Sequence, residues 1–187
     1  MIGIDSFSDE YYEIVHLTED VDVSGFVSNK GYGLEVYLKR YALGDELANI
    51  SRTYLVLDKS TKQIAAYFTL RTGLITVSRG FLKGFDAYTG IELANFAVND
   101  SYREVHEVIP RFGAHIFYQF ILPLTLEISK YVGAAYLYIY ALPDDRLMAH
   151  YETMGFEHTS EKMKRFIYRH VKPVYDEGCM FMWQKIV

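Results

Sequence analysis

The sequence predicts an α/β fold, a single domain over residues 1–187 in which helices cover both faces of a central mixed sheet. Half of the 187 residues are hydrophobic, which is enough for one buried core. Segments with the alternation of strands and segments with the spacing of helices follow one another along the chain. Residues 91–140 have the order strand, long helix, strand, which favours a right-handed crossover between two parallel strands.

The first half of the chain is expected to form a strand, two helices and an antiparallel hairpin. A helix capped by Ser24 or Ser28 should end near Gly44, because glycine breaks helices. The polar residues 58–62 are typical of a turn between two strands. The expected elements are a strand over 11–17, a helix through 34–41, a short helix over 45–49, and strands over 52–57 and 63–71.

The second half is expected to alternate strands and helices after an irregular loop at residues 78–90. The helix over 112–131 should be kinked at Pro123, which has no amide to donate. The strand over 135–140 is apolar throughout, as in a sheet covered on both faces. The remaining elements are a strand over 91–98, a helix carrying Tyr151, a strand over 155–159, a helix over 161–171 and a strand over 179–186.

Charge and composition limit the classes of protein that fit. The formal charge of −5 argues against a surface that generally coats nucleic acid. However, residues 161–173 contain five basic residues and one acidic residue. That run reads either as a solvated helix face or as a contact for the phosphate of a cofactor or nucleic acid.

Targeting and metal signals are weak in this sequence. No segment has ~18 uninterrupted apolar residues, and the acidic N-terminus does not read as a secretory signal, so a cytoplasmic protein without a membrane span is expected. Cys179 is the only cysteine, and the histidines show no metal-ligand spacing with it or with each other. No metal is expected.

Residues 110–114, Pro-Arg-Phe-Gly-Ala, stand between a strand and a helix and could hold a phosphate. Unpaired amides and the positive dipole end at a helix start bind anions, and Gly113 would let a ligand approach the backbone. The alternative is that Gly113 serves only the turn, since a glycine before a helix is common.

Residues 147–156 place a tyrosine near the end of a helix that follows the apolar strand. Gly155 and Phe156 end this helix and open the next strand. A phenol beside the end of a central strand suits a proton donor to a leaving group. The alternative for Tyr151 is a structural ring, because the chain contains 17 tyrosines.

Taken together, these segments resemble the GNAT family of N-acetyltransferases over about residues 10–187. The matching segments are the central strand at 92–99, the pyrophosphate loop at 108–117, the Tyr-x-x-x-Gly-Phe signature within 150–156, and the tail at 176–182. Residues 29–52 resemble the N-terminal helices of the toxin-like branch, whose substrate is the amino group of an aminoacyl-tRNA.

The resemblance implies direct transfer of an acetyl group from acetyl-CoA to a primary amine. Tyr151 would protonate the departing thiolate, and Glu92 would serve as the base for the amine, since burial makes a carboxylate a stronger base. The other reading of Glu92 is a strand-edge carboxylate paired with a cation. The residues implied for cofactor binding are Phe96, Ala97, Val98, Arg111, Phe112, Gly113 and Ala114.

One position departs from the family pattern, because Arg111 stands where the first glycine of the phosphate loop is usual. Its guanidinium could contact phosphate, or its side chain could obstruct the loop. The second reading favours another function, a degenerate acetyltransferase fold used as a binding or regulatory module.

The acceptor amine is left open between aminoacyl-tRNA, a small molecule and a protein. If the chain is a toxin, the resemblance implies an antitoxin partner, and a homodimer is a further expectation.

Overall fold

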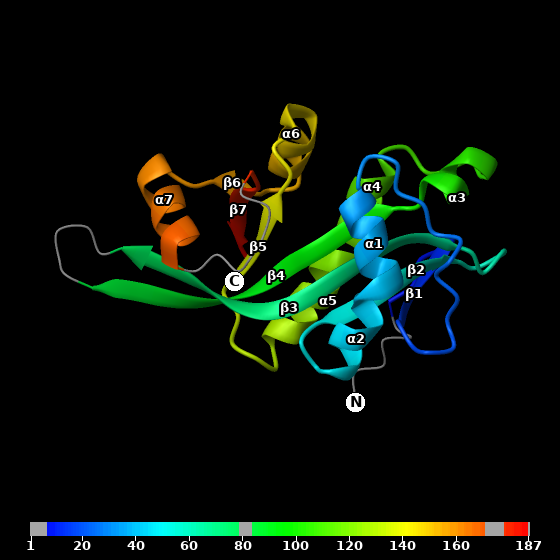
Figure 1. Cartoon of the computed structure of the whole chain (residues 1–187), viewed down its shortest axis with the longest axis horizontal. Coiled ribbons are helices and arrows are strands. Elements are labelled where there is room, and N and C mark those ends of the chain that lie inside the picture. Colours follow the sequence, from blue (N-terminus) through cyan, green and yellow to red (C-terminus); the bar gives the residue numbers. More distant parts are fainter. Residues whose placement is uncertain (1–6, 79–83, 171–177, 187) are drawn as a thin grey trace. The chain divides into compact units, whose positions relative to one another are not determined.

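The computed structural model describes residues 7–78, 84–170 and 178–186, and its strands form one mixed sheet (Figure 1). The strand order is β1-β2-β3-β4-β5-β7-β6. β4 and β5 run parallel, whereas β1/β2, β2/β3, β5/β7 and β6/β7 are antiparallel. The strands are β1 Tyr12–His16, β2 Arg52–Asp58, β3 Ile64–Ser78, β4 Phe85–Val98, β5 Tyr136–Ala141, β6 Glu157–His158 and β7 Met180–Lys185.

The helices lie between these strands in the order of the chain. They are α1 Tyr32–Arg40, α2 Ala42–Leu47, α3 Asp100–Val105, α4 Phe112–Ile116, the π-helical turn η2 Phe117–Ile121, α5 Leu122–Ser129, α6 Asp145–Thr153 and α7 Glu161–His170. In the part of the chain that the structure describes, none of them is long and apolar enough to cross a membrane. The chain forms two compact units, and the boundaries between them fall within β3 and β4. Unit 1 is Met1–Arg71 with Leu93–Leu124, and unit 2 is Thr72–Glu92 with Thr125–Val187.

In unit 1, α1 and α2 cover one face of the sheet. Leu38 and Ala42 belong to a buried cluster with Leu55 on β2, Tyr67 on β3 and Ala97 on β4. The Tyr67 hydroxyl also donates a 2.6 Å hydrogen bond to the carbonyl oxygen of Leu34 in α1. The helical pair is therefore held by apolar burial and by a polar contact.

The opposite face of unit 1 receives α4. Val15 on β1 pairs with Leu55 and shares its face, so Tyr12, an odd number of residues away, points to the other face. The Tyr12 ring lies 5.1 Å, centroid to centroid, from the ring of Phe112 in α4. Helices thus cover both faces of this unit, as the sequence predicts.

In unit 2, α7 packs on the strands through its apolar side. Met163 and Ile167, one helical turn apart, pack with Phe181 of β7 and Tyr138 of β5. Tyr138 fills the space left by the lack of a side chain at Gly73, where a Cβ would lie 1.9 Å from the tyrosine hydroxyl oxygen. This glycine is required by a close approach within the unit.

Most of the expected elements are present, and the parallel pairing of the strands on either side of the long helix is confirmed. The expected loop at 78–90 is wrong where it can be tested: residues 85–90 belong to β4, because sheet pairing overrides their weak local pattern. Residues 79–83 lie outside the described residues. Helix α3 was not expected.

Two predicted helix boundaries are wrong. Gly31, not Ser24 or Ser28, caps α1, and Glu35 instead accepts the Ser28 amide at 3.0 Å. Gly44 lies inside α2, where a Cβ would meet nothing within 4 Å. A solvent-facing glycine costs a helix only about 0.5–1 kcal/mol, so it does not end one whose neighbours are packed.

The expected irregularity at Pro123 takes the form of a π-helical turn just before it. The Leu122 amide donates to the carbonyl of Phe117, five residues earlier. In a regular α-helix the proline ring would press on the carbonyl of residue 119, and a wider turn relieves that clash.

Substitution of Gly73 by alanine should lower the free energy of unfolding by about 1–3 kcal/mol, because the new methyl group overlaps Tyr138. The matched substitution Gly44→Ala should raise it by about 0.5–1 kcal/mol, because that site is open and helical. Urea denaturation measures both. Equal effects of the two substitutions would contradict the role given to Gly73.

Candidate functional site

Helix α6 begins where the sequence places a start signal after the apolar strand. Asp144 is its N-cap, and its carboxylate accepts the Leu147 amide at 2.9 Å. The helix ends at Thr153, and Gly155 adopts a left-handed φ of 89° that favours glycine. The Phe156 amide then donates back to the carbonyl of Tyr151 at 3.1 Å, so the chain turns tightly into β6.

Tyr151 lies in the last turn of α6, and its side chain is buried. Only 8% of its surface is exposed, and its ring meets that of Phe156 edge to face at 5.6 Å. Burial raises the pKa of its phenol to about 12, and a phenol is protonated at neutral pH even at its ordinary pKa of about 10. No hydrogen bond joins its hydroxyl to any residue that the structure describes. A protonated, unengaged phenol is what a proton donor requires.

Glu92 lies on β4 at the last residue pair that β4 forms with β5. The register runs from Gly90↔Tyr136 to Glu92↔Tyr138, although β4 continues to Val98. Glu92 is 3% exposed, and it has an interaction partner. The structure thus places this carboxylate in a buried row of side chains rather than at an outer sheet edge.

The C-terminal part of β4 belongs to unit 1. Ala97 is buried in the core beneath α1, whereas Phe96 and Val98 are half-buried. Among the described residues, β5 forms no pair with β4 beyond Glu92. Backbone groups of residues 96–98 on that side are therefore not used by a β4–β5 ladder.

The segment predicted to hold phosphate starts α4. Arg111 is the N-cap residue, with φ 56° and ψ 44°, a left-handed conformation that favours glycine. Phe112 is buried against Tyr12, whereas Gly113 and Ala114 are half-buried. The first amides of a helix have no partner within it, so they remain available to an anion.

The Arg111 side chain is exposed and forms no ion pair within the described ranges. It is therefore not packed into the turn that it caps. Glycine would adopt this backbone conformation without the steric cost of a side chain. The side chain of α4 that does form a polar contact is that of His115, whose Nε2 lies 2.6 Å from a carboxylate oxygen of Asp9.

The predicted site residues fall into two groups. Phe96, Ala97 and Val98 and the start of α4 lie in unit 1, and Glu92 and Tyr151 lie in unit 2. Among residues 7–78, 84–170 and 178–186, no cluster of three His, Cys, Asp or Glu could hold a metal ion.

The sequence reading missed the role of Tyr138. Gly90, like Gly73, faces this ring: a Cβ on Gly90 would lie 3.1 Å from a ring carbon of Tyr138. The signal that could have found it is a glycine inside each of two neighbouring strands, which marks close approach of another group.

Comparison with known proteins identifies the fold. No protein-family model and no curated protein sequence matches the chain. Among solved structures, a tyrosine-to-phenylalanine mutant of the AtaT toxin bound to the C-terminus of the antitoxin AtaR is 17% identical, covers 94% of this chain and 93% of its own, and has a TM-score of 0.65. A KacTA–DNA complex is 18% identical over 94% of this chain and 93% of its own, with a TM-score of 0.64.

AtaT complexed with acetyl-methionyl-tRNAfMet is also similar, at 18% identity over 91% of this chain and 93% of its own and a TM-score of 0.64. The chain has the fold of these toxins. The expected GNAT-like fold, with its mixed central sheet, is confirmed.

Replacement of Arg111 by glycine should raise the free energy of unfolding by about 0.5–1 kcal/mol, because glycine adopts φ 56° without the steric cost of a side chain. Arg103→Gly is the matched control. It lies in helix α3, where the same change should destabilise by about 1 kcal/mol. Chemical denaturation of both variants tests this; a loss of stability at Arg111 would refute the strain.

Proposed function

We propose that the protein is an acetyl-CoA-dependent N-acetyltransferase that acylates a primary amine by direct attack. The observation that carries the proposal is Tyr151, a buried and protonated phenol whose hydroxyl no described residue engages, in the fold of the toxins above. Structures of a tyrosine-to-phenylalanine mutant exist for both AtaT and KacT, so a tyrosine has been a target of substitution in two proteins of this fold.

The reaction balances in one acyl transfer. The amine nitrogen attacks the thioester carbonyl carbon, the new carbon–nitrogen bond forms, and the carbon–sulfur bond breaks. The departing thiolate takes a proton from the Tyr151 hydroxyl, and the attacking amine gives up a proton to a base. The products are an acetamide and the free thiol of coenzyme A, and exchange with solvent returns the proton from the base to Tyr151.

The start of α4 is the proposed pyrophosphate contact. The amides of Phe112, Gly113 and Ala114 lie at the positive dipole end of a helical stretch that continues through α5. Arg111 would add a charge-assisted bond, since its guanidinium is exposed and not engaged by a described carboxylate. Backbone groups of Phe96, Ala97 and Val98 would bind the pantetheine arm and the thioester oxygen.

Glu92 is the proposed base, acting on the amine directly or through one water. Its place in the row with Tyr138 supports this role, because the carboxylate is on a rigid strand and shielded from bulk solvent.

For the acceptor we propose the amino group of an aminoacyl-tRNA. AtaT has been solved with acetyl-methionyl-tRNAfMet and with acetyl-CoA, and its fold covers more than nine-tenths of this chain. Arg165 and Arg169 on α7 support an RNA ligand, since both are exposed and neither is ion-paired in the described part of the chain. An antitoxin is the proposed protein partner, as AtaR is for AtaT.

Titration with acetyl-CoA by calorimetry tests the cofactor. The wild-type chain should bind, and Arg111→Gly should weaken binding about tenfold, the effect of losing one charge-assisted hydrogen bond. Arg103→Gly should leave the affinity unchanged. Tighter binding by Arg111→Gly would show that the arginine obstructs the loop. No binding by the wild type at millimolar ligand would favour a binding module without catalysis.

Replacement of Tyr151 by phenylalanine should lower turnover by roughly 10²-fold or more, because the departing thiolate then lacks its proton donor. The affinity for acetyl-CoA should stay the same. Tyr131→Phe, at a tyrosine that is 67% exposed, is the control and should keep full turnover. If Tyr151→Phe also keeps it, the phenol has only a packing role.

A further inference from the structure

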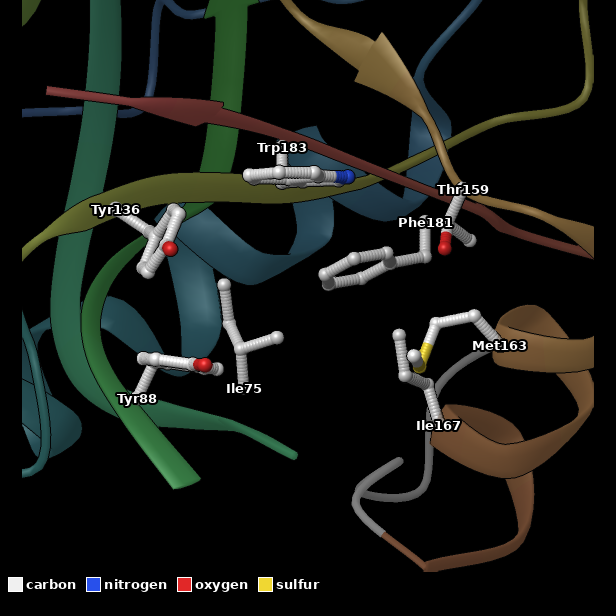
Figure 2. A pocket seen from close by; sticks show the side chains of 8 residues that line it. All are labelled: Ile75, Tyr88, Tyr136, Thr159, Met163, Ile167, Phe181 and Trp183. Carbon is white, nitrogen blue, oxygen red and sulfur yellow. The ribbon is translucent and has the colours of Figure 1, made fainter. Parts of the chain in front are cut away.

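Unit 2 contains a pocket of about 250 Å³ between its strands and α7 (Figure 2). Tyr88, Tyr136, Phe181 and Trp183 contribute aromatic rings from β4, β5 and β7, and Met163 and Ile167 of α7 lie across from them. The ring centroid of Tyr136 is 5.5 Å from that of Tyr88 and 5.2 Å from that of Trp183. Tyr88 is 39% exposed, so the pocket is open to solvent on its side.

The chemistry of the walls selects a neutral, flat ligand with polar edges. Among the residues that the structure describes, no charged side chain lines the pocket. The hydroxyls of Tyr88, Tyr136 and Thr159 and the indole N–H of Trp183 form no hydrogen bond with any described residue. A half-buried tryptophan N–H ordinarily finds an acceptor. A purely apolar occupant would leave these groups unused.

The size fits a fused heterocycle. An apolar cavity of about 150 Å³ holds benzene, so a space of about 250 Å³ accommodates a larger ring system. Aromatic side chains on which a base can stack are the usual platform for nucleobases, because every base has a π face.

The pocket and Glu92 lie on the same face of the sheet. Tyr138 pairs with both Glu92 of β4 and Trp183 of β7, so the three side chains form one row across three strands. With neighbouring strands about 4.8 Å apart, the backbones of Glu92 and Trp183 are about 10 Å apart. In an aminoacyl nucleotide, the ester and the ribose separate the amine from the base by a comparable span.

A cation stands beside the pocket on the same face. Lys185 is the next residue after Trp183 on that side of β7, and it pairs with Tyr136. Its side chain is exposed and forms no ion pair among the residues that the structure describes. It is placed to meet a phosphate attached to an occupant of the pocket.

We infer that this pocket binds the terminal nucleobase of an RNA 3′ end that carries the aminoacyl ester, with its 5′-phosphate at Lys185 and its amine toward Glu92. The inference rests on the proposed function for the position of the amine, and on the pocket alone for the base. The pocket thereby becomes a specificity site for nucleotide-linked amines over free ones.

Trp183 is the only tryptophan of the chain, so its fluorescence reports directly on the pocket. Titration of the full-length protein with adenosine should quench it saturably, and adenosine 5′-monophosphate should bind more tightly than adenosine. Lys185→Ala should remove the difference between the two ligands and leave the affinity for adenosine unchanged. N-acetyl-phenylalanine amide, a probe for a peptide side chain, should not quench.

Three variants make the test specific. Ile75→Phe, at a buried residue of the pocket wall, fills the space and should abolish quenching. Leu74→Phe is the matched control, because it is 52% exposed on the other face of β3. Should Ile75→Phe fail to fold, Tyr88→Leu, at the open rim, should weaken adenosine binding roughly 5- to 150-fold, as expected for one lost stacking ring.

Absence of quenching by adenosine and the monophosphate overturns the inference, as does quenching by the peptide probe alone. Acetyl-CoA affinity, measured on the same protein, separates the two proposals. If acetyl-CoA binds and adenosine does not, the nucleobase pocket is wrong and the acetyltransferase stands. If adenosine binds and acetyl-CoA does not, the nucleobase pocket stands and the acetyltransferase is wrong.

Discussion

The arrangement of unit 2 depends on the contact between the Tyr138 ring and two glycines. Gly73 and Gly90 leave the space that the ring occupies, and any side chain at Gly73 would overlap its hydroxyl. The ring of Tyr138 therefore has a defined place in the row of paired residues Glu92, Tyr138 and Trp183. The predicted base and the aromatic pocket are therefore parts of one packed surface.

The candidate catalytic groups differ in how the fold prepares them. Tyr151 carries its proton at neutral pH, as a phenol does, and no described residue engages its hydroxyl, so the proton can pass to a leaving group. Arg111 caps α4 in a conformation that costs energy for any residue with a side chain. An arginine in a conformation suited to glycine is accounted for if its charge binds a ligand, and this is the reason we favour phosphate contact over obstruction.

Much of the fold could be predicted from the sequence because its signals are local. The apolar run of β5, the polar turn after β2 and the glycine that ends α6 each depend on neighbouring residues. The start of β4 could not be predicted, because its pairing partners supply the stabilisation that its own pattern lacks. The candidate site was predictable only where a motif is continuous, as around Tyr151. The pocket brings together residues as far apart in sequence as Ile75 and Trp183, so no local pattern reveals it.

Transfer of an acetyl group to an aminoacyl-tRNA leaves a product that mass spectrometry identifies. Purified protein would be incubated with acetyl-CoA and charged tRNA, and the aminoacyl group would then be released and analysed by mass spectrometry. We expect an N-acetylated amino acid, formed only when both substrates are present, together with one equivalent of free coenzyme A thiol. Full recovery of the unmodified amino acid, from a protein that binds acetyl-CoA and is folded, would contradict it.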